Sequence, residues 1–157
     1  MAVSGGAEIG GQPIGETELA ITRTLAAARG RVFEAWSDAA LFRQWWMPEG
    51  AGITMLECDL DVRTGGSYRL VYAFGDAGKM AFHGTYPEVV PDARIVWTNA
   101  EDPDGAITTV TLAEADGGTL LTYHERYPSQ AARDEALAGS ALALPQQLNQ
   151  LAALLEG

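Results

Sequence analysis

Residues 129–156 read SQAARDEALAGSALALPQQLNQLAALLE and form the stretch that decides the fold. Apolar residues recur in it at steps of three and four, the period that places side chains on one face of a helix. They are Leu137, Ala141, Leu144, Leu148, Leu151 and Leu155. We therefore predict a long C-terminal helix with one apolar face, and such a face needs a partner surface to cover it.

The same stretch carries helix-breaking residues in its middle. Pro145 removes one backbone hydrogen bond and clashes with the carbonyl of Ala141, at a cost of about 3 kcal/mol inside an uninterrupted helix. Gly139 and Ser140 weaken the same region. We predict a kink or a break between Gly139 and Pro145, and Pro145 is suited to start a second helical segment. A hinge over a cavity mouth and a plain surface loop between two short helices both fit this pattern.

The chain before this helix reads mainly as strands. Residues 17–25 alternate between apolar and polar side chains, which predicts a first strand. Residues 30–36 and 38–46 follow with helical spacing and predict two short helices, the second capped by Asp38. Further strands are predicted over residues 53–61, 68–74, 80–90, 94–98, 107–114 and 119–127. Their short connections favour an antiparallel meander, because parallel pairs need crossovers of a dozen or more residues.

The fold class predicted from these elements is α+β. We expect a curved antiparallel sheet of about six or seven strands, wrapped on the long C-terminal helix, with two short helices after the first strand. Residues 17–157 fit one domain of ordinary size. Residues 1–16 contain five glycines before Glu16, and we expect them to form a flexible N-terminal tail.

The amino-acid composition limits the kinds of binding partner and the cellular compartment that we expect. The net charge is −11, with 21 acidic residues against 10 basic ones, so we expect no nucleic acid and no anionic membrane as partner. No apolar run approaches the roughly 20 residues of a membrane-spanning helix, and the N-terminus lacks the features of an export signal. Cys58 is the only cysteine and reads as a partly buried strand residue. We predict a cytoplasmic protein.

Aromatic residues dominate the candidate ligand-binding site. Rings with hydroxyl groups among apolar side chains are the usual lining of small-molecule cavities. The candidates are Trp45, Trp46, Tyr68, Tyr72, Phe82, Tyr86, Trp97 and Tyr123, together with Leu144 and Leu148 on the helix. Packing in a solid core is the alternative role for each of them.

Catalytic and metal-binding motifs are sparse. His83, Tyr123 and Glu125 are candidates for an acid or a base, although His124 and Glu125 are neighbours and so point to opposite faces of a strand. We predict no metal site, because neither histidine has a cysteine or histidine partner at the spacing of metal ligands. No cofactor-binding motif is present, and we expect no cofactor. We expect Arg63 to pair with Asp61 beside the turn at Gly65.

Several short segments resemble one known family. They are Ile21-Thr22-Arg23, Arg31 to Trp36 (RVFEAW), Leu41 to Pro48 (LFRQWWMP), Asp61 to Arg69 (DVRTGGSYR), Gly84-Thr85-Tyr86, Glu88 to Pro91 (EVVP) and Gly118 to Thr122 (GTLLT). In this order they resemble the bacterial proteins related to the activator of Hsp90 ATPase (the AHSA1-like family), within the START-like or Bet v 1-like (SRPBCC) superfamily. The resemblance spans residues 17–155. It implies the helix-grip fold and a ligand cavity between the sheet and the long helix.

Three hypotheses about function follow. The leading one is a protein that holds a small apolar or amphipathic molecule in that cavity. The second is an enzyme of the cyclase or hydrolase kind that uses the same cavity. The third is a chaperone-related protein-interaction module, for which an exposed apolar patch would be expected, and such a patch would also suit a homodimer.

Overall fold

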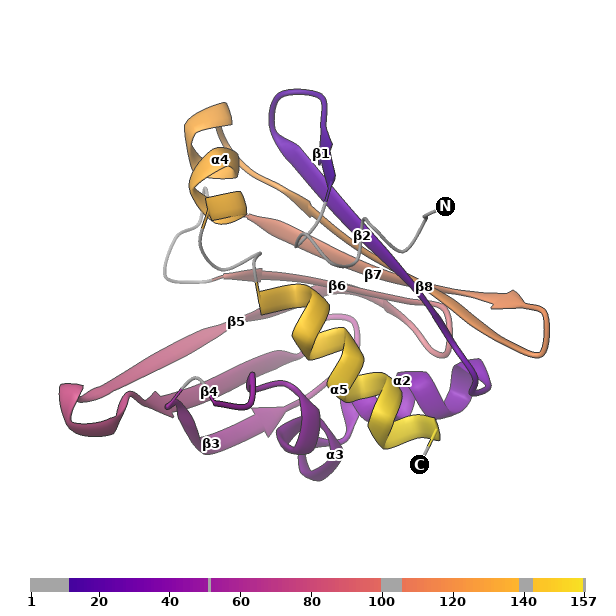
Figure 1. Ribbon diagram of the computed structural model, residues 1–157, viewed down its shortest axis with the longest axis horizontal. Coiled ribbons are helices and arrows are strands. Elements are labelled where there is room, and N and C mark those ends of the chain that lie inside the picture. The colour runs from indigo at the N-terminus through magenta and orange to yellow at the C-terminus, as the bar shows by residue number, and fades with distance from the viewer. Residues whose placement is uncertain (1–11, 51, 100–105, 139–142, 157) are drawn as a thin grey trace.

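The computed structural model describes residues 12–50, 52–99, 106–138 and 143–156. Within these ranges the chain forms eight strands and four α-helices (Figure 1). In chain order they are β1 (Gln12–Ile14), β2 (Glu18–Leu25), α2 (Arg29–Ser37), α3 (Ala39–Trp45), β3 (Thr54–Leu60), β4 (Ser67–Ala73), β5 (Lys79–Val90), β6 (Arg94–Asn99), β7 (Ile107–Ala115), β8 (Gly118–Arg126), α4 (Gln130–Ala138) and α5 (Leu144–Glu156).

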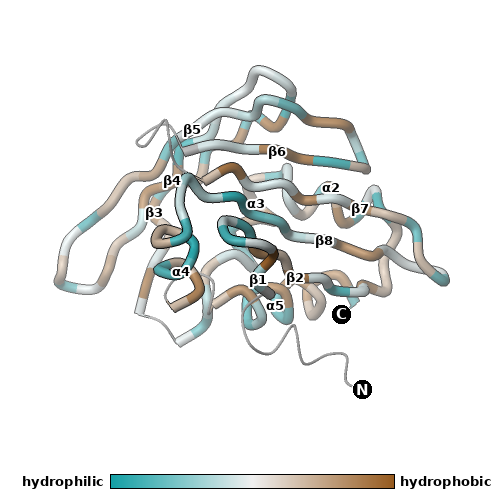
Figure 2. The backbone as a smooth tube through the Cα atoms, turned by 90° about the horizontal axis from the view of Figure 1, so that it is seen from above, coloured by the Kyte–Doolittle hydropathy of each residue, from teal (hydrophilic) through white to brown (hydrophobic). Residues whose placement is uncertain are grey.

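All eight strands belong to one antiparallel sheet, in the order β1-β2-β8-β7-β6-β5-β4-β3. The α+β class and the antiparallel sheet are therefore confirmed. The sheet curves around α5, which lies in its concave side (Figure 1). Apolar and polar residues alternate along the strands, as Figure 2 shows, so one face of each strand is suited to the interior.

The strand count is higher than the six or seven predicted, because β1 lies within the expected N-terminal tail. Gln12 pairs with Ala20 and Ile14 with Glu18, after a turn in which Gly15 has a φ of 56°. Glycine adopts that backbone conformation readily. This short edge strand is held by main-chain pairing and shows little apolar alternation, so its three residues carry no strand signal. Residues 1–11 of the expected tail lie outside the described residues.

Two short helices after β2 close one end of the sheet, as predicted. Asp38 caps α3, since its carboxylate accepts hydrogen bonds from the backbone N–H groups of Ala40 at 2.9 Å and Leu41 at 3.2 Å. The helix α3 buries Phe42 and Trp45, and α2 buries Val32, Ala35 and Trp36. These aromatic side chains place the two helices against the concave side of the sheet.

The C-terminal stretch forms two helices, α4 and α5, which agrees with the predicted interruption before Pro145 and with a second helical segment that starts at this proline. Pro145 lies in the first turn of α5, where its missing N–H costs nothing. The apolar face of α5 buries Leu144, Leu148, Leu151 and Leu155 as expected. Leu137 lies on α4 and is half-buried, while Gly139, Ser140 and Ala141 lie outside the described residues.

A buried arginine fixes α4 beside the β1–β2 turn, away from α5 (Figure 1). Arg133 donates hydrogen bonds to the backbone carbonyls of Gly15 at 3.2 Å and Glu18 at 3.0 Å, and its guanidinium lies 2.9 Å from the Asp134 carboxylate. Because these acceptors lie in the β1–β2 turn and at the first residue of β2, α4 is attached to the sheet edge and leaves the concave side to α5.

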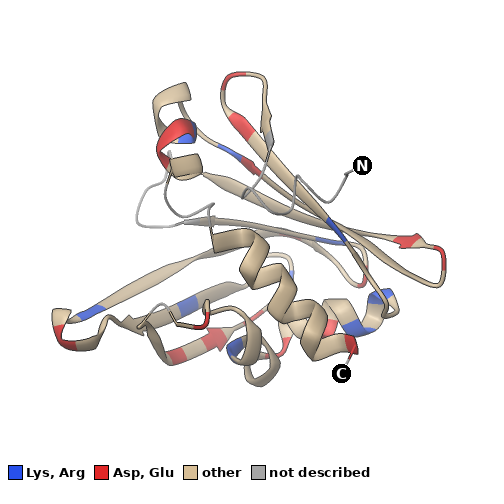
Figure 3. Ribbon diagram, viewed as in Figure 1, with Lys and Arg blue, Asp and Glu red and all other residues tan. Residues whose placement is uncertain are grey.

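Charged residues lie mainly on turns, strand edges and helix ends (Figure 3). The predicted pair is present, with Arg63 Nε 3.0 Å from a carboxylate oxygen of Asp61. Among the described residues, no helix combines the length and the apolar character required to cross a membrane.

Candidate functional site

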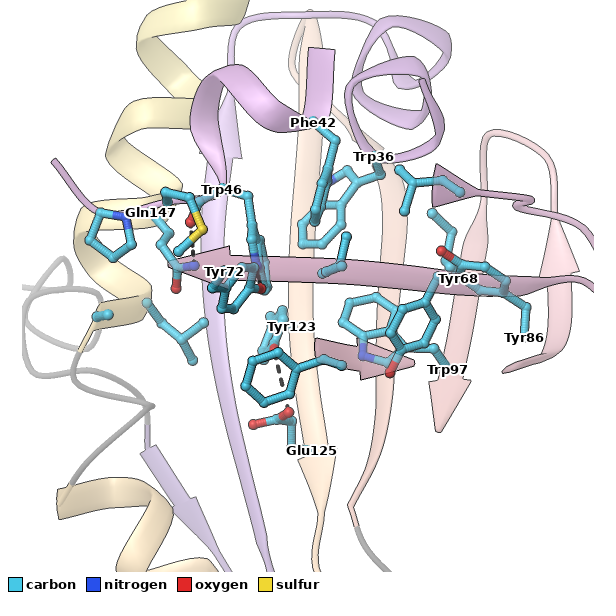
Figure 4. Close-up of a pocket in the computed structure, with 18 residues that line it drawn as sticks. Trp36, Phe42, Trp46, Tyr68, Tyr72, Tyr86, Trp97, Tyr123, Glu125 and Gln147 are labelled. Carbon is cyan, nitrogen blue, oxygen red and sulfur yellow. Dashed lines mark hydrogen bonds between the residues drawn. The ribbon is translucent and has the colours of Figure 1, made fainter. Parts of the chain in front are cut away.

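A cavity of about 390 Å³ lies between the sheet and the N-terminal end of α5. Its floor is formed by strands β3, β4, β5, β6 and β8, and its roof by α2, α3, the segment after α3 and α5. The floor residues are Leu60, Tyr68, Leu70, Tyr72, Phe82, Tyr86, Ile95, Trp97, Tyr123 and Glu125, and the roof residues are Trp36, Phe42, Trp46, Met47, Pro48, Ala143, Leu144 and Gln147 (Figure 4).

Strand β4 supplies three floor residues because of its alternation. Tyr68, Leu70 and Tyr72 point to one face and pair across to Gly84, Phe82 and Met80 of β5. Gly84 makes room for the Tyr68 ring, since a Cβ there would lie 2.7 Å from that ring and 1.8 Å from the Thr98 carbonyl oxygen. The Tyr68 hydroxyl donates to this same carbonyl at 3.0 Å. The missing side chain at residue 84 thus fixes the position of one tyrosine in the cavity floor.

The roof is a cluster of aromatic rings around Trp36. The Trp36 ring centroid lies 4.6 Å from that of Trp45, 5.9 Å from that of Trp46 and 6.3 Å from that of Phe42. Trp45 is fully buried behind this layer, and its indole N–H donates to the Ala35 carbonyl at 2.9 Å. Trp45 therefore attaches α3 to α2 and does not reach the cavity.

Two hydrogen bonds restrain the roof. The Trp46 indole N–H donates to the Tyr72 hydroxyl at 2.9 Å, which joins the roof to the floor on one side of the cavity (Figure 4). The Gln147 amide of α5 donates to the Trp46 carbonyl at 2.6 Å. These bonds restrain three cavity-lining side chains and oppose the closure of the space by rotation of the rings.

One carboxylate faces this largely aromatic space. The half-buried side chain of Glu125 accepts hydrogen bonds from the hydroxyls of Thr108 at 2.7 Å, Tyr123 at 3.2 Å and Tyr127 at 2.5 Å. The first two hydroxyls bind the oxygen Oε2, and Tyr127 binds Oε1. Glu125 is the most polar group of the cavity wall.

Burial keeps the tyrosines around this carboxylate protonated. Desolvation, followed by the negative charge of Glu125, raises the pKa of Tyr123 well above its ordinary value, and the same two causes raise the pKa of Tyr127. Desolvation also raises the pKa of Tyr72 to about 12 and raises that of Tyr86. These phenols are therefore hydrogen-bond donors at neutral pH and poor bases.

Eight of the ten predicted ligand-binding residues line the cavity: Trp46, Tyr68, Tyr72, Phe82, Tyr86, Trp97, Tyr123 and Leu144. Trp45 and Leu148 are buried elsewhere, at 0% and 1% exposure. Contact of any of these residues with a ligand stays a prediction.

Sequence reasoning missed ten lining residues. They are Trp36, Phe42, Met47, Pro48, Leu60, Leu70, Ile95, Ala143 and Gln147, with Glu125 considered only as a catalyst. Trp36 and Phe42 carried a usable signal, because each lies on the apolar edge of a predicted helix next to an aromatic candidate. Gln147 carried none, since a polar residue on an exposed helix face has the same pattern.

The catalytic candidates separate into two groups. Tyr123 and Glu125 line the cavity, whereas His83 is exposed and is not among the lining residues. His124 points to the face of β8 opposite to Glu125, as the alternation predicted, and its Nε2 lies 2.6 Å from a carboxylate oxygen of Glu18. Within the described parts of the chain, no group of three potential metal ligands comes together.

Cys58 lies outside the cavity lining, buried in β3 against α3. Its Sγ is 3.8 Å from the Ala39 carbonyl oxygen, and burial raises its pKa to about 11. The expectation of a buried strand residue is confirmed, and the thiol is protonated and unreactive near neutral pH.

Comparison with known proteins identifies relatives of this fold and cavity. The sequence profile of the family described as Activator of Hsp90 ATPase homolog 1-like protein matches residues 26–156. A protein of Chromobacterium violaceum has a crystal structure that is similar at 33% identity and a TM-score of 0.75, covering 90% of this chain and 98% of that one. No curated protein matches the chain.

Two further solved structures show the same fold. A protein of Rhodobacter sphaeroides matches at 25% identity with a TM-score of 0.82, over 92% of this chain and 95% of that one. The solution structure of an AHSA1-like protein from Aeromonas hydrophila matches at 20% identity with a TM-score of 0.70, over 87% and 94% of the two chains. The architecture is the Bet v 1-like helix-grip fold, which the sequence segments had indicated.

Proposed function

The chain belongs to the family of Activator of Hsp90 ATPase homolog 1-like proteins, and we propose that it binds one small, mainly apolar molecule in the cavity under α5. The observation that carries this proposal is the space of about 390 Å³ between sheet and helix, where half of the lining residues are aromatic and most of the others are apolar. Its size falls in the range of small-molecule sites, which are generally apolar with a few placed polar groups.

The hydrogen bonds across the cavity support this proposal. Protein interiors are normally close-packed, so an unfilled apolar space loses contact energy for every side chain around it. Here the bond from Trp46 to Tyr72 joins the roof to the floor, and the bond from Gln147 to Trp46 joins α5 to the segment after α3, so these lining side chains are restrained from turning into the space. A bound molecule would restore the missing contacts without requiring the protein to rearrange.

The proposal is tested by filling the cavity with a side chain. Ala143 lines the cavity at the start of α5, whereas Ala153 is exposed on the same helix. Octanol is the probe, and its binding is measured by isothermal titration calorimetry. We expect Ala143→Phe to weaken octanol binding by about tenfold or more, because the ring occupies part of the space. Ala153→Phe is the matched control and leaves the affinity at the wild-type value.

Native mass spectrometry of gently purified protein adds a test that needs no probe. A reproducible extra mass that is lost on denaturation, and that Ala143→Phe reduces, supports the proposal. Octanol binding that is absent, or equally weakened by the two phenylalanine variants, contradicts it.

A second candidate function is acid–base catalysis in the same cavity, favoured by the presence of Tyr123 and Glu125 in its wall. The raised pKa of Tyr123 keeps its phenol protonated, as a hydrogen-bond donor, so Glu125 is the group suited to act as base. A product mass formed from a bound molecule by the wild type, and not by Glu125→Gln, would favour this enzyme over a simple binding protein.

The family name also suggests a chaperone-associated role, which we rank below ligand binding. The large exposed apolar residues among those described are Ile14, Leu56, Met80, Val90 and Leu120. They come from β1, β3, β5 and β8, no two of which are adjacent in the sheet, and Met80 and Val90 lie near opposite ends of β5. This scatter gives little support for a protein-docking patch. A homodimer stays a prediction, which the mass of the native protein tests.

A further inference from the structure

We propose that the ligand of this cavity carries a protonated amine, which binds Glu125 while the apolar part of the molecule lies against the aromatic roof. This inference rests on the proposed function and names the chemical class of the ligand. Three independent features of the cavity support it: the position of Glu125, the free acceptor capacity of its carboxylate, and the rings that surround it.

The position of Glu125 follows from the register of the sheet. Glu125 of β8 pairs with Leu19 of β2 on one side and with Thr108 of β7 on the other, and Thr108 pairs with Trp97 of β6. Residues paired across a sheet point to the same face, so these four side chains form one row on the concave face. Leu19 is fully buried and Thr108 is 2% exposed. A carboxylate in such a row is held away from bulk water except through the cavity.

The hydrogen bonds of Glu125 leave room for one more donor. An ionised carboxylate offers about four acceptor positions on its two oxygens. The hydroxyls of Thr108 and Tyr123 take two positions on Oε2, and Tyr127 takes one on Oε1. Oε1 is therefore able to accept a further hydrogen bond from a ligand.

The charge of Glu125 has no cationic side chain within ion-pair distance in the described parts of the chain. None of the ion pairs among the described residues includes Glu125. Hydroxyl donors partly compensate the cost of withdrawing a carboxylate from water, and a cation compensates it more fully. A ligand ammonium would supply both the missing donor and the missing positive charge.

The rings beside Glu125 suit a cation as well. The Tyr123 hydroxyl donates to Glu125, and the Tyr123 ring centroid lies 6.1 Å from that of Trp97, which belongs to the same row across the sheet as Glu125. Tryptophan and tyrosine attract cations within about 6 Å of the ring centroid. In Figure 4, Phe42 and Glu125 lie at opposite ends of the cavity, which matches a molecule with one apolar and one charged end.

The net charge of −11 acts in the same direction. A negative protein attracts cationic ligands and repels anionic ones such as fatty acids. Between amphipathic molecules of equal length, the molecule with an amine is thus favoured by the local carboxylate, by the rings and by the overall field.

The experiment compares octylamine, octanol and octanoate at pH 7, with affinities measured by isothermal titration calorimetry. The three probes share one alkyl chain and differ in the charge of the polar end, since the amine is protonated at this pH. For the wild type we expect octylamine to bind about 10- to 100-fold more tightly than octanol, the range of a charge-assisted hydrogen bond, and octanoate to bind most weakly.

Glu125→Gln assigns the preference to one residue. It removes the charge with little change in volume, and we expect it to lower the ratio of octylamine affinity to octanol affinity, both measured on the variant, from about 10–100 to about one. Glu18→Gln is the matched control, because it removes one charge from a half-buried carboxylate on the outer face of the same sheet. It retains the preference for octylamine.

The outcomes separate the two proposals. Equal affinity of the wild type for octylamine and octanol overturns the amine inference and leaves the proposed function standing. Failure of all three probes to bind overturns both. An equal loss of preference in Glu125→Gln and Glu18→Gln assigns the effect to net charge and overturns the role of Glu125. The ranking of the three probes is measured on the wild type and does not depend on the folding of either variant.

Discussion

The interior under α5 consists of two regions that differ in packing. In the packed half, Leu148, Leu151 and Leu155 of α5 are buried and the helix contacts α2, α3 and β2. In the cavity half, Leu144 and Gln147 of the same helix border an open space of about 390 Å³. The same helical face thus covers a solid core at one end and an open cavity at the other. The side chains opposite the helix therefore determine whether a region is packed or open.

The opposing side chains differ in shape and in their polar groups. The packed half presents Leu25 and Val32, which are fully buried branched side chains able to interdigitate. The cavity half presents large rings, several of which are restrained by hydrogen bonds to the backbone or to each other. Rigid rings held at one end do not rotate to fill a gap. A leucine stripe is therefore compatible with a binding cavity when it faces restrained aromatic residues.

The largest expected effect comes from truncating a leucine in each half. Leu151→Ala opens a new void in the packed half, and we expect the free energy of unfolding to fall by about 2–5 kcal/mol. Leu70→Ala enlarges a space that already exists, and we expect a loss near the lower end of that range, about 2 kcal/mol. Both losses in the free energy of unfolding are measured by urea denaturation. The comparison requires that the slope of free energy against urea concentration is the same in the wild type and the variants.

Octanol affinity should respond to the two substitutions in the opposite order to stability. Leu70→Ala changes the affinity for octanol because residue 70 lines the cavity, whereas Leu151→Ala leaves it unchanged at temperatures where the variant is folded. Equal stability losses combined with equal changes in octanol affinity would show that the two halves behave as one core.

The sequence predicted the packed half better than the cavity half. The spacing of the leucines after Pro145 and the Asp38 cap each depend on local chemistry that a single segment carries, and both are confirmed. The short strand β1 depends on main-chain pairing with β2, which leaves little trace in its own three residues. Features that depend on local side-chain patterns can thus be predicted from the sequence, whereas an edge strand that forms through backbone pairing alone cannot.

The candidate site was predictable in kind but not in its details. The alternation of β4 placed Tyr68 and Tyr72 on one face, but which face looks inward depends on the register of the whole sheet. The importance of Glu125 could not be derived, because Thr108 and Trp97 are brought beside it by strand pairing over long sequence distances. Trp45 and Trp46 are adjacent in sequence, and only the orientation of α3 sends one into the core and the other into the cavity wall.

High pH offers a second way to separate the two halves. The cavity half holds Tyr72, Tyr86 and Tyr123, whose pKa values burial raises above the ordinary value of 10.0. A raised pKa in the folded state means that the native protein holds these protons more tightly than the unfolded chain. The resulting stability is fully present below pH 10.0 and is lost as the pH rises further. Cys58 adds the same dependence from its ordinary value of 9.0 upward.

Tyr86→Phe tests this assignment. The variant lacks one ionisable hydroxyl of the cavity half. Its melting temperature should therefore fall less steeply between pH 9 and pH 11.5 than that of the wild type, and the difference in slope should correspond to roughly one titrating group. Thermal unfolding followed by circular dichroism gives the slope, and the absorbance of tyrosinate reports when the phenols ionise. Identical slopes for the two proteins would place the alkaline sensitivity outside the cavity.

The smallest expected effect concerns the hydrogen bond between Trp46 of the roof and Tyr72 of the floor. Tyr72→Phe keeps the ring and removes the hydroxyl that accepts from the Trp46 indole at 2.9 Å, so we expect the free energy of unfolding to fall by about 1 kcal/mol. Trp46→Phe removes the donor and adds the loss of part of a ring. If the bond holds the roof above the floor, the two substitutions are not independent, and their combined loss is smaller than the sum of the single losses by about 0.5–1 kcal/mol.

The same double-mutant cycle is repeated with octanol bound. The coupling energy between residues 46 and 72 then shows whether this bond keeps the cavity open or has no effect on its size. A bond that keeps the space open matters less once a ligand fills it, because the ligand then supports the roof by contact. The coupling between residues 46 and 72 should therefore shrink in the presence of octanol. A coupling of the same size with and without octanol would mean that the rings stay apart for reasons of packing alone, and the contrast between the two halves would then rest on ring shape and not on hydrogen bonding.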